Sequence, residues 1–347
     1  MKRVIDVNPK LNEKIDELIQ NKEYKGFQHF ADVALENQVL WETEEEGSVE
    51  SSGSSSKIAS KNMSSNHWTV LSTIPKGEIM TLDTPSNDNL VGRILWGQYY
   101  RFLSAKFAVR ILANMSTSDL PELRKYVDQT VDAALSLRQK LVGIDKKEKK
   151  NFGERLSASF PTRSDKSMKR FALQYIIYVR SGDYKLDGFL PRLKLVNITD
   201  KNDENLQIGL TKFGREFATM RNPILDENGS MSLSNEEIEF LLNHIADNLP
   251  EEAEHMQYAL KTISSGTSTR EDLNKEMRRY YRKYDESAPW SDAVVNTMRA
   301  GLLSRMFDLD LLKREKTGKN VRYSLSERGN KFLNEFSVRK DVEEKVA

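Results

Sequence analysis

One pattern occurs twice in this chain, as Leu206-Gln-Ile-Gly-Leu-Thr-Lys-Phe-Gly-Arg-Glu-Phe217 and as Val321-Arg-Tyr-Ser-Leu-Ser-Glu-Arg-Gly-Asn-Lys-Phe332. Another strand-like run and a polar turn precede each copy, at residues 193–205 and 311–320. Two β-prone runs joined by a short polar turn predict a hairpin. The shared ending, Leu-[Ser/Thr]-x-x-Gly-x-x-Phe, predicts a helix capped by Thr211 or Ser326. The sequence therefore predicts an internal repeat of strand, turn, strand and helix.

A helical pattern with one polar stripe precedes each copy. In the first, residues 165–180 are expected to expose Lys166, Lys169, Arg170 and Gln174. In the second, residues 292–307 are expected to turn outward Asn296, Thr297, Arg299 and Arg305. Arg, Lys, Asn and Gln side chains on one stripe are what reading of the major groove requires. Further cations, Arg278, Arg279 and Arg282, lie on the helix before the second of these.

This arrangement resembles the end of winged helix-turn-helix domains, more specifically in the second copy. The resemblance implies that the helix before each hairpin enters the major groove. It also implies that Lys316, Lys319 and Arg322 of the second wing contact backbone phosphates or the minor groove. The first wing carries Asp200, Asp203 and Glu204 and is a poor phosphate ligand. We therefore expect one copy to bind DNA and the other mainly to pack or dimerise.

The N-terminal 41 residues predict a strand followed by two short helices. Alternation in Arg3-Val-Ile-Asp-Val7 suggests the strand, and Asn8-Pro9 is a favourable start for the first helix. Apolar residues at helical spacing follow, up to Trp41. A unit of this size does not bury a sufficient core as a monomer, so dimerisation is expected.

The same stretch resembles the ribbon-helix-helix family of DNA-binding proteins. In that family two chains pair their strands into a ribbon that enters the major groove. If Ile5 and Val7 point into the core, alternation turns Lys2, Val4 and Asp6 outward as candidate base readers. The alternative is that this module only dimerises the chain and that Lys2 and Asp6 form a solvated edge.

The intervening segments complete a mainly α fold with short β elements and four parts. Residues 1–43 are the ribbon-helix-helix module, and the Ser- and Glu-rich residues 44–66 are a flexible linker. Residues 67–228 form a helical domain ending in a winged-helix-like unit, with long helices expected over 95–115 and 121–144. Residues 232–340 form a C-terminal winged-helix domain. Residues 67–228 are also the candidate surface for a protein partner.

Composition narrows the function classes. The 347 residues carry a net charge of +1 and no cysteine, which removes disulfides and cysteine-based zinc sites. The four histidines show no metal-binding spacing, and neither a phosphate-binding glycine loop nor a nuclease carboxylate pattern occurs. We therefore expect no metal, no cofactor and no enzyme. The absence of a long apolar run and of a secretory signal predicts a cytoplasmic, nucleoid-associated protein without a membrane partner.

Charge is nevertheless concentrated locally. Residues 146–185 contain eleven Lys or Arg against four Asp or Glu, and residues 313–322 contain five against one. Basic stripes on a neutral protein favour contact with phosphates. The expected function is therefore that of a homodimeric, sequence-preferring DNA-binding protein, most simply a transcriptional regulator. Two alternatives stay open: an architectural or adaptor protein in plasmid or chromosome partition, or in a defence or mobile-element complex, and a protein-interaction module dimerised by residues 1–41.

Overall fold

The computed structural model describes residues 67–92, 94–150, 154–180, 184–200, 206–227, 229–282, 290–317 and 320–335. All of them belong to one compact unit that spans residues 62–347. The predicted ribbon-helix-helix module, with Lys2, Val4 and Asp6, and the predicted linker 44–66 lie outside the described residues.

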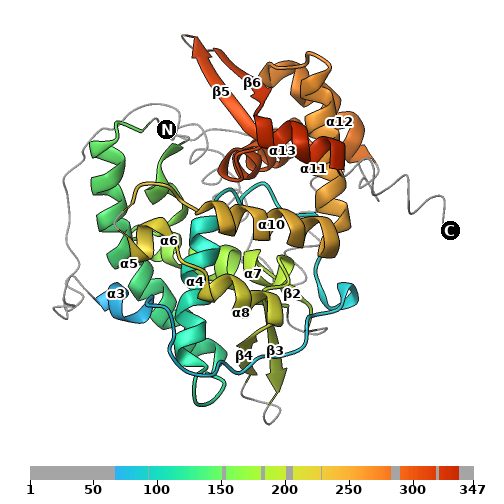
Figure 1. The fold of residues 1–347 in the computed structure, drawn as a ribbon. Helices are drawn as coiled ribbons and strands as arrows, with labels where there is room; N and C mark the ends of the chain where they lie inside the picture. Colours follow the sequence, from blue (N-terminus) through green and yellow to red (C-terminus); the bar gives the residue numbers. More distant parts are fainter. Residues whose placement is uncertain are drawn as a thin grey trace, which may run out of the picture. The chain divides into compact units, whose positions relative to one another are not determined.

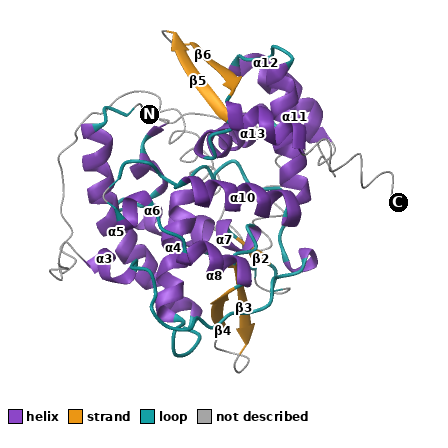
Figure 2. Ribbon diagram, in the orientation of Figure 1, coloured by secondary structure: helices purple, strands orange, loops and turns teal. Residues whose placement is uncertain are grey.

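The described part is mainly helical with short antiparallel strand pairs, which confirms the predicted fold class at this level (Figures 1 and 2). The longer helices are α4 (Phe102–Met115), α5 (Leu123–Lys147), α8 (Lys212–Thr219), α10 (Asn235–Asn248), α11 (Pro250–Ser264), α12 (Arg270–Tyr281) and α13 (Asp292–Asp308), followed by a helix over 327–335. The short ones are α3 (His67–Leu71), α6 (Asp165–Arg170), α7 (Phe189–Arg192), α9 (Pro223–Asp226), the 3-10 turns η1 (Asn87–Asn89) and η3 (Leu156–Ser159), and the π-helix η4 (Phe171–Ile176). The strand pairs are β1 (Tyr178–Val179) with β2 (Leu186–Asp187), β3 (Val196–Asp200) with β4 (Leu206–Leu210), and β5 (Leu312–Thr317) with β6 (Asn320–Leu325).

The two sequence repeats adopt one local geometry. Before each hairpin one residue has a positive φ, Lys194 at 54° and Asp310 at 55°. Its carbonyl accepts a hydrogen bond from the helix cap, at 2.7 Å from Thr211 Oγ1 and at 2.5 Å from Ser326 Oγ. The same cap hydroxyl accepts from the amide of Gly214 or Gly329. The shared Thr/Ser and Gly therefore join the start of the hairpin to the helix that follows it.

The equivalence extends upstream, to helices that share no obvious sequence pattern. Glu122, before α5, forms an antiparallel bridge to Gln207 of β4, and Thr269, before α12, forms the same bridge to Arg322 of β6. The neighbouring amides donate in the same way, from Ile208 to Pro121 O and from Tyr323 to Ser268 O, both at 3.1 Å. Each repeat thus begins with two helices, and a residue between them forms a β-bridge to the second strand of the hairpin that follows later in the repeat.

The repeats differ in the helix that directly precedes the hairpin. In the second repeat this is the 17-residue α13. In the first it is the four-residue α7, all of whose residues are buried. The helix predicted over 165–180 is instead α6 and η4, and it ends at Ile176 because Ile177 is extended and leads into β1. This helix does precede the first hairpin, as predicted, but it ends before residue 180, and the β1–β2 hairpin and α7 intervene.

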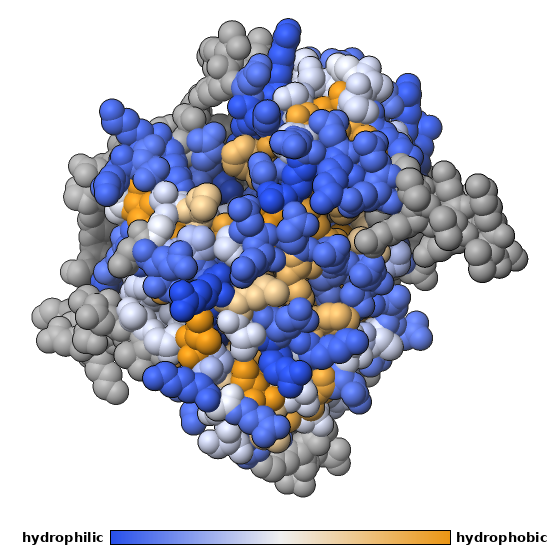
Figure 3. Space-filling model, viewed as in Figure 1, coloured by the Kyte–Doolittle hydropathy of each residue, from blue (hydrophilic) through white to orange (hydrophobic). Residues whose placement is uncertain are grey.

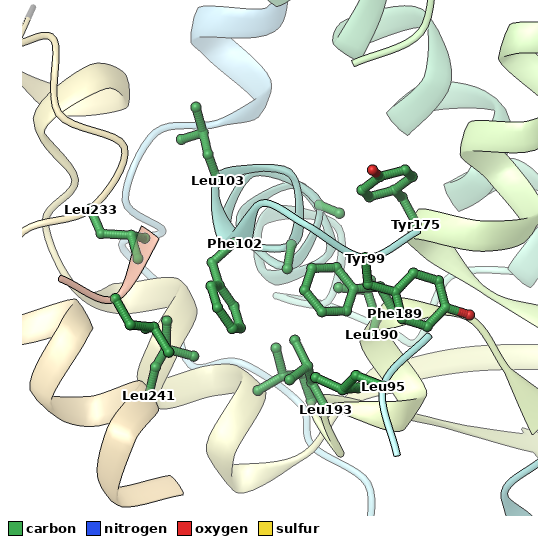
Figure 4. Close-up of a cluster of buried hydrophobic side chains, with 14 of the residues drawn as sticks. Leu95, Tyr99, Phe102, Leu103, Tyr175, Phe189, Leu190, Leu193, Leu233 and Leu241 are labelled. Atoms are coloured by element: carbon green, nitrogen blue, oxygen red, sulfur yellow. The ribbon is translucent and has the colours of Figure 1, made fainter. Parts of the chain in front are cut away.

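A single apolar core runs through both repeats, so residues 67–228 and 232–335 do not have separate interiors. Helix α4 is buried from Phe102 to Ala113 and forms its centre. Figure 4 shows Phe102 of α4 beside Phe189 of α7 and facing Leu241 of α10, and the Phe102 and Phe189 rings lie 5.5 Å apart. The helix predicted from Leu95 begins only at Phe102.

Residues 94–101 form a largely buried, irregular connection from which Trp96 protrudes, and Gly97 in this connection packs directly on α13. The amide of Gly97 donates to Met298 Sδ at 3.2 Å. A methyl group on Gly301 would lie 2.0 Å from the carbonyl oxygen of Gly97. Two glycines therefore permit this backbone contact between segments that are far apart in the sequence.

Buried cations fasten α4 to the elements around it. Lys106 is fully buried, forms an ion pair with Glu237 of α10 at 2.8 Å, and donates to the carbonyls of Phe217 and Met220. Arg110 pairs with Asp226 of α9 at 2.9 Å and donates to Ala218 O. Burial lowers the pKa of Lys106 to about 8, although the Glu237 carboxylate opposes that shift. These contacts give both cations a structural role.

We expect Gly301→Ala to lower the free energy of unfolding by about 2 kcal/mol or more, because the added methyl overpacks the contact with Gly97. Gly143→Ala is the matched control, since Gly143 is also helical and nothing lies within 4 Å of the place that an added methyl would take. Removing this helical glycine should stabilise the protein by about 1 kcal/mol. Urea denaturation of both variants measures the effects, and equal changes would contradict the close approach.

The pKa of Lys106 predicts a specific pH dependence of stability. Its folded value of about 8 lies below the ordinary 10.5, so the unfolded state binds more protons between these values and stability rises with pH in this window. From about pH 7.5 to about pH 9.5 this one group should add about 2 kcal/mol. The double variant Lys106→Met/Glu237→Gln should lack that contribution. Parallel urea titrations at the two pH values test this, and identical pH dependence in both proteins would disprove it.

Candidate nucleic-acid interface

Helix α13 presents one narrow accessible stripe. Its N-terminus is capped by Ser291, whose hydroxyl accepts from the amide of Val294. Ala293 and Asn296 are exposed, and further along the same stripe the partly buried residues are Thr297, Ala300 and Ser304. The spacing of three and four residues places them along one face. The accessible surface of α13 is therefore small and uncharged beyond its first turn.

Two of the four α13 residues predicted to be exposed are in fact buried. Asn296 and Thr297 belong to the stripe, but Arg299 is only 7% exposed and Arg305 is fully buried. The prediction that these two arginines face outward was wrong. It treated α13 as covered on one side only, whereas residues 95–99 cover a second side.

Arg305 is the centre of a buried polar network. Its Nε and Nη2 atoms donate to Glu252 Oε1 of α11 at 3.0 and 2.6 Å. Its Nη1 atom donates to the carbonyls of Trp96 and Tyr99 at 3.0 and 2.8 Å. The other oxygen of Glu252 accepts from the amide of Leu95 at 3.0 Å. Arg305 and Glu252 together hold the 95–99 segment against α11 and α13.

Charge keeps this network ionised despite its burial. Burial by itself raises the pKa of Glu252, but the Arg305 guanidinium and His255 outweigh it and lower the pKa below its usual value. His255 Nδ1 lies 3.5 Å from Glu252, and His255 Nε2 lies 2.7 Å from the hydroxyl of Tyr281. A second buried pair, Arg101 with Asp308 at 3.0 Å, fixes the end of α13 beside the start of α4.

The cations of α12 are largely neutralised. Arg278 pairs with Asp292 and donates to Trp290 O, so it ties α12 to the start of α13. Arg279 pairs with Glu276 at 2.9 Å, and Lys275 lies 3.7 Å from Asp272. Arg282 is exposed just beyond the helix. This helix therefore contributes less positive charge than its sequence suggests.

The β5–β6 hairpin carries its exposed cations on one face. Lys313 and Arg322 are exposed, and Arg322 lies opposite Glu315 in the register. Arg314 points the other way, over the ring of Phe307 at 4.8 Å, and burial lowers its pKa. The hairpin projects away from α11–α13 (Figure 1). Of the predicted tip residues, Lys319 and the side chain of Lys316 lie outside the described part.

The cations predicted for the first copy form a surface of their own. Lys166 and Lys169 are exposed on α6, and Arg170 and Gln174 are partly buried. The tip of the first hairpin, at residues 201–205, is outside the described part. Sequence reasoning missed the exposed aromatic residues nearby, Tyr178 and Tyr184, which are 41% and 63% accessible. The turn signal Ser181-Gly-Asp183, with a tyrosine and a basic residue on either side, was the available clue.

The described part contains no group of three or more His, Asp or Glu side chains placed to hold a metal ion. None of its helices is both long and apolar enough to cross a lipid bilayer. On the face drawn in Figure 3, apolar residues are scattered among hydrophilic ones.

The burial of Arg305 and the exposure of Asn296 predict mutational effects on stability of very different size. Arg305→Met should cost about 3 to 5 kcal/mol of unfolding free energy, because it leaves Glu252 buried without its cation. Asn296→Ala should change stability by less than about 0.5 kcal/mol, as expected for an exposed side chain. Urea denaturation of the two variants tests this, and a mild effect of Arg305→Met would mean that the arginine is accessible.

Comparison of this chain with protein-family models, with curated proteins and with solved structures gave no match. Because one fold serves many functions, what this chain binds depends on the side chains that its surface leaves accessible.

Proposed function

We propose that this chain is a homodimeric, sequence-preferring DNA-binding protein whose second repeat is a winged-helix domain. The observation that carries the proposal is the complete order of elements: α11, the bridging Thr269, α12, α13 and the β5–β6 hairpin. In winged-helix proteins a helix equivalent to α13 enters the major groove and the hairpin contacts the backbone beside it. Supporting charge comes from the exposed Lys313 and Arg322, although Glu315 lies opposite Arg322 in the hairpin.

The accessible stripe of α13 suggests what it reads. Asn296 has the donor and acceptor needed for a bidentate contact with adenine, and small side chains such as Ala293 and Ala300 leave room for a thymine methyl. Arg282 and the hairpin cations Lys313 and Arg322 flank this stripe in the sequence and supply phosphate contacts. We therefore propose a preference for A·T pairs under α13.

In this proposal the N-terminal module supplies a second DNA contact and the dimer interface. We propose that residues 1–41 pair two chains as a ribbon-helix-helix dimer, with Lys2, Val4 and Asp6 facing the groove. Two tethered contacts on one duplex bind more tightly than either alone. Such a protein would act as a nucleoid-associated transcriptional regulator.

An adaptor role in DNA partition or in a larger DNA-recognition complex is the second candidate. It is favoured by the first repeat, in which the position of α13 is taken by the buried α7. A repeat of this kind cannot enter a groove and instead packs within the fold. A regulator should protect a short palindrome, whereas a partition adaptor should cover repeated sites and recruit an ATPase.

The test uses the full-length protein and a labelled random-sequence duplex of about 30 base pairs, with anisotropy read over a salt series. Affinity should fall steeply with salt, because each phosphate contact contributes about 0.9 to the logarithmic slope. Lys313→Gln/Arg322→Gln should reduce that slope by about 2. Asn296→Ala should leave the slope unchanged and weaken enrichment of A·T-containing sites from a random pool.

Lys76→Gln is the matched control, since Lys76 is exposed but lies outside the second repeat. Absence of binding to any duplex at low salt would overturn the proposal. An unchanged slope in the double hairpin variant, with binding retained, would show that the second repeat is not the contact.

A further inference from the structure

The segment from α6 to β2 builds a surface that the winged-helix proposal does not use. We define it as the basic aromatic face: Lys166, Lys169, Arg170, Leu173, Tyr178, Arg180, Tyr184 and Lys185. Between residues 163 and 185 the sequence has six Lys or Arg against two Asp. The segment belongs to the first repeat, but it is absent from the second.

The helical part of this face is a single stripe. Lys166, Lys169, Arg170 and Leu173 are spaced by three, four and seven residues, which places them on one side of the helix. Lys166 and Lys169 are exposed, and Leu173 is 37% accessible despite its apolar side chain. The opposite side packs inward through Phe171, Tyr175 and Ile176.

The hairpin part places tyrosines beside cations. Tyr178 pairs with Asp187, and the Arg180 amide donates to Lys185 O at 2.9 Å, so Tyr178, Arg180 and Lys185 lie on the outer face. Val179 and Leu186 take the alternate positions, and Leu186 is buried. Only Ile177 separates this hairpin from η4, which keeps the two parts of the face adjacent.

Tyr184 is held in an unfavourable backbone conformation. Its φ is 52°, in the left-handed region that bulky side chains seldom occupy, and 63% of the side chain is accessible. Strain of this kind is concentrated at binding sites. Burial does not compensate for it here, because the ring faces solvent.

We propose that the basic aromatic face binds single-stranded nucleic acid, with phosphates on its cations and unpaired bases stacked on Tyr178 and Tyr184. Cationic grooves with exposed aromatic rings bind single strands because every base offers a π face. A duplex hides those faces in its own stack, so it uses only the charge. An acidic protein would likewise leave the two rings without a stacking partner. This site is separate from the duplex contact proposed for α13 and the β5–β6 hairpin.

The experiment measures binding of a labelled oligo(dT) of about 15 nucleotides, the upper end of the usual site size, to the full-length protein by anisotropy. Tyr178→Ala and Tyr184→Ala should each weaken binding about 5- to 150-fold, the range given by alanine substitution at stacking positions. Tyr184→Trp should retain binding, and its fluorescence should be quenched by the oligonucleotide. Lys166→Gln/Lys169→Gln should reduce the salt slope by about 1.4, because a single strand contributes about 0.7 per contact.

Controls separate this site from the duplex site. Met231→Ala removes an equally exposed apolar side chain outside the face and should have no effect. Lys313→Gln/Arg322→Gln should leave oligo(dT) affinity unchanged, and Tyr184→Ala should leave duplex affinity unchanged. Oligo(rU) in place of oligo(dT) shows whether RNA or DNA is preferred, and tighter binding of either supports the site.

Two results would overturn the inference. One is equal oligo(dT) affinity of the wild type and both tyrosine variants. The other is an equally tight complex with a poly-glutamate peptide that is also insensitive to Tyr184→Ala, since charge alone would then explain binding. Thermal melting of each variant confirms folding, which exposed tyrosines should not disturb.

Discussion

The rest of the structure depends on the buried ion pair between Arg305 of α13 and Glu252 of α11. Two charges removed from water are costly unless every donor and acceptor is used. Here that requirement draws in the backbone of residues 95–99, far away in the sequence, as the remaining partner. The pair therefore joins the two repeats into one body and limits which side of α13 is left accessible.

In the proposed binding mode, that restriction places base recognition and positive charge on different elements. Because Arg299 and Arg305 are buried, α13 leaves Asn296 and small side chains accessible, which in the proposed binding mode would discriminate bases but attract phosphates weakly. Positive charge is placed instead on the projecting β5–β6 hairpin. Separating the two would let affinity and sequence preference be changed by different residues.

How far the sequence predicted this structure depended on the range of the interactions. The hairpins and the caps Thr211 and Ser326 were predicted because a few neighbouring residues determine them. The outward placement of Arg305 failed because its partners come from a distant segment that no local pattern reveals. The prediction that a helix begins at Leu95 was wrong for the same reason, because Gly97 and its neighbours form contacts with the distant α13 instead. The tyrosines of the basic aromatic face were missed because alternation in two-residue strands is too short to recognise.

The two repeats show how one local scaffold can present different surfaces. Their hairpins share hydrogen bonds to within a few tenths of an ångström, yet the segment between the second helix and the hairpin differs completely. In the second repeat it contains α13, which keeps an accessible stripe. In the first it contains α6, η4 and the β1–β2 hairpin, while α7 is buried at the position of α13. Because core packing fills the position of α13 in the first repeat, that repeat has no accessible counterpart of the α13 stripe, and its exposed Tyr178 and Tyr184 lie on or beside the inserted β1–β2 hairpin instead.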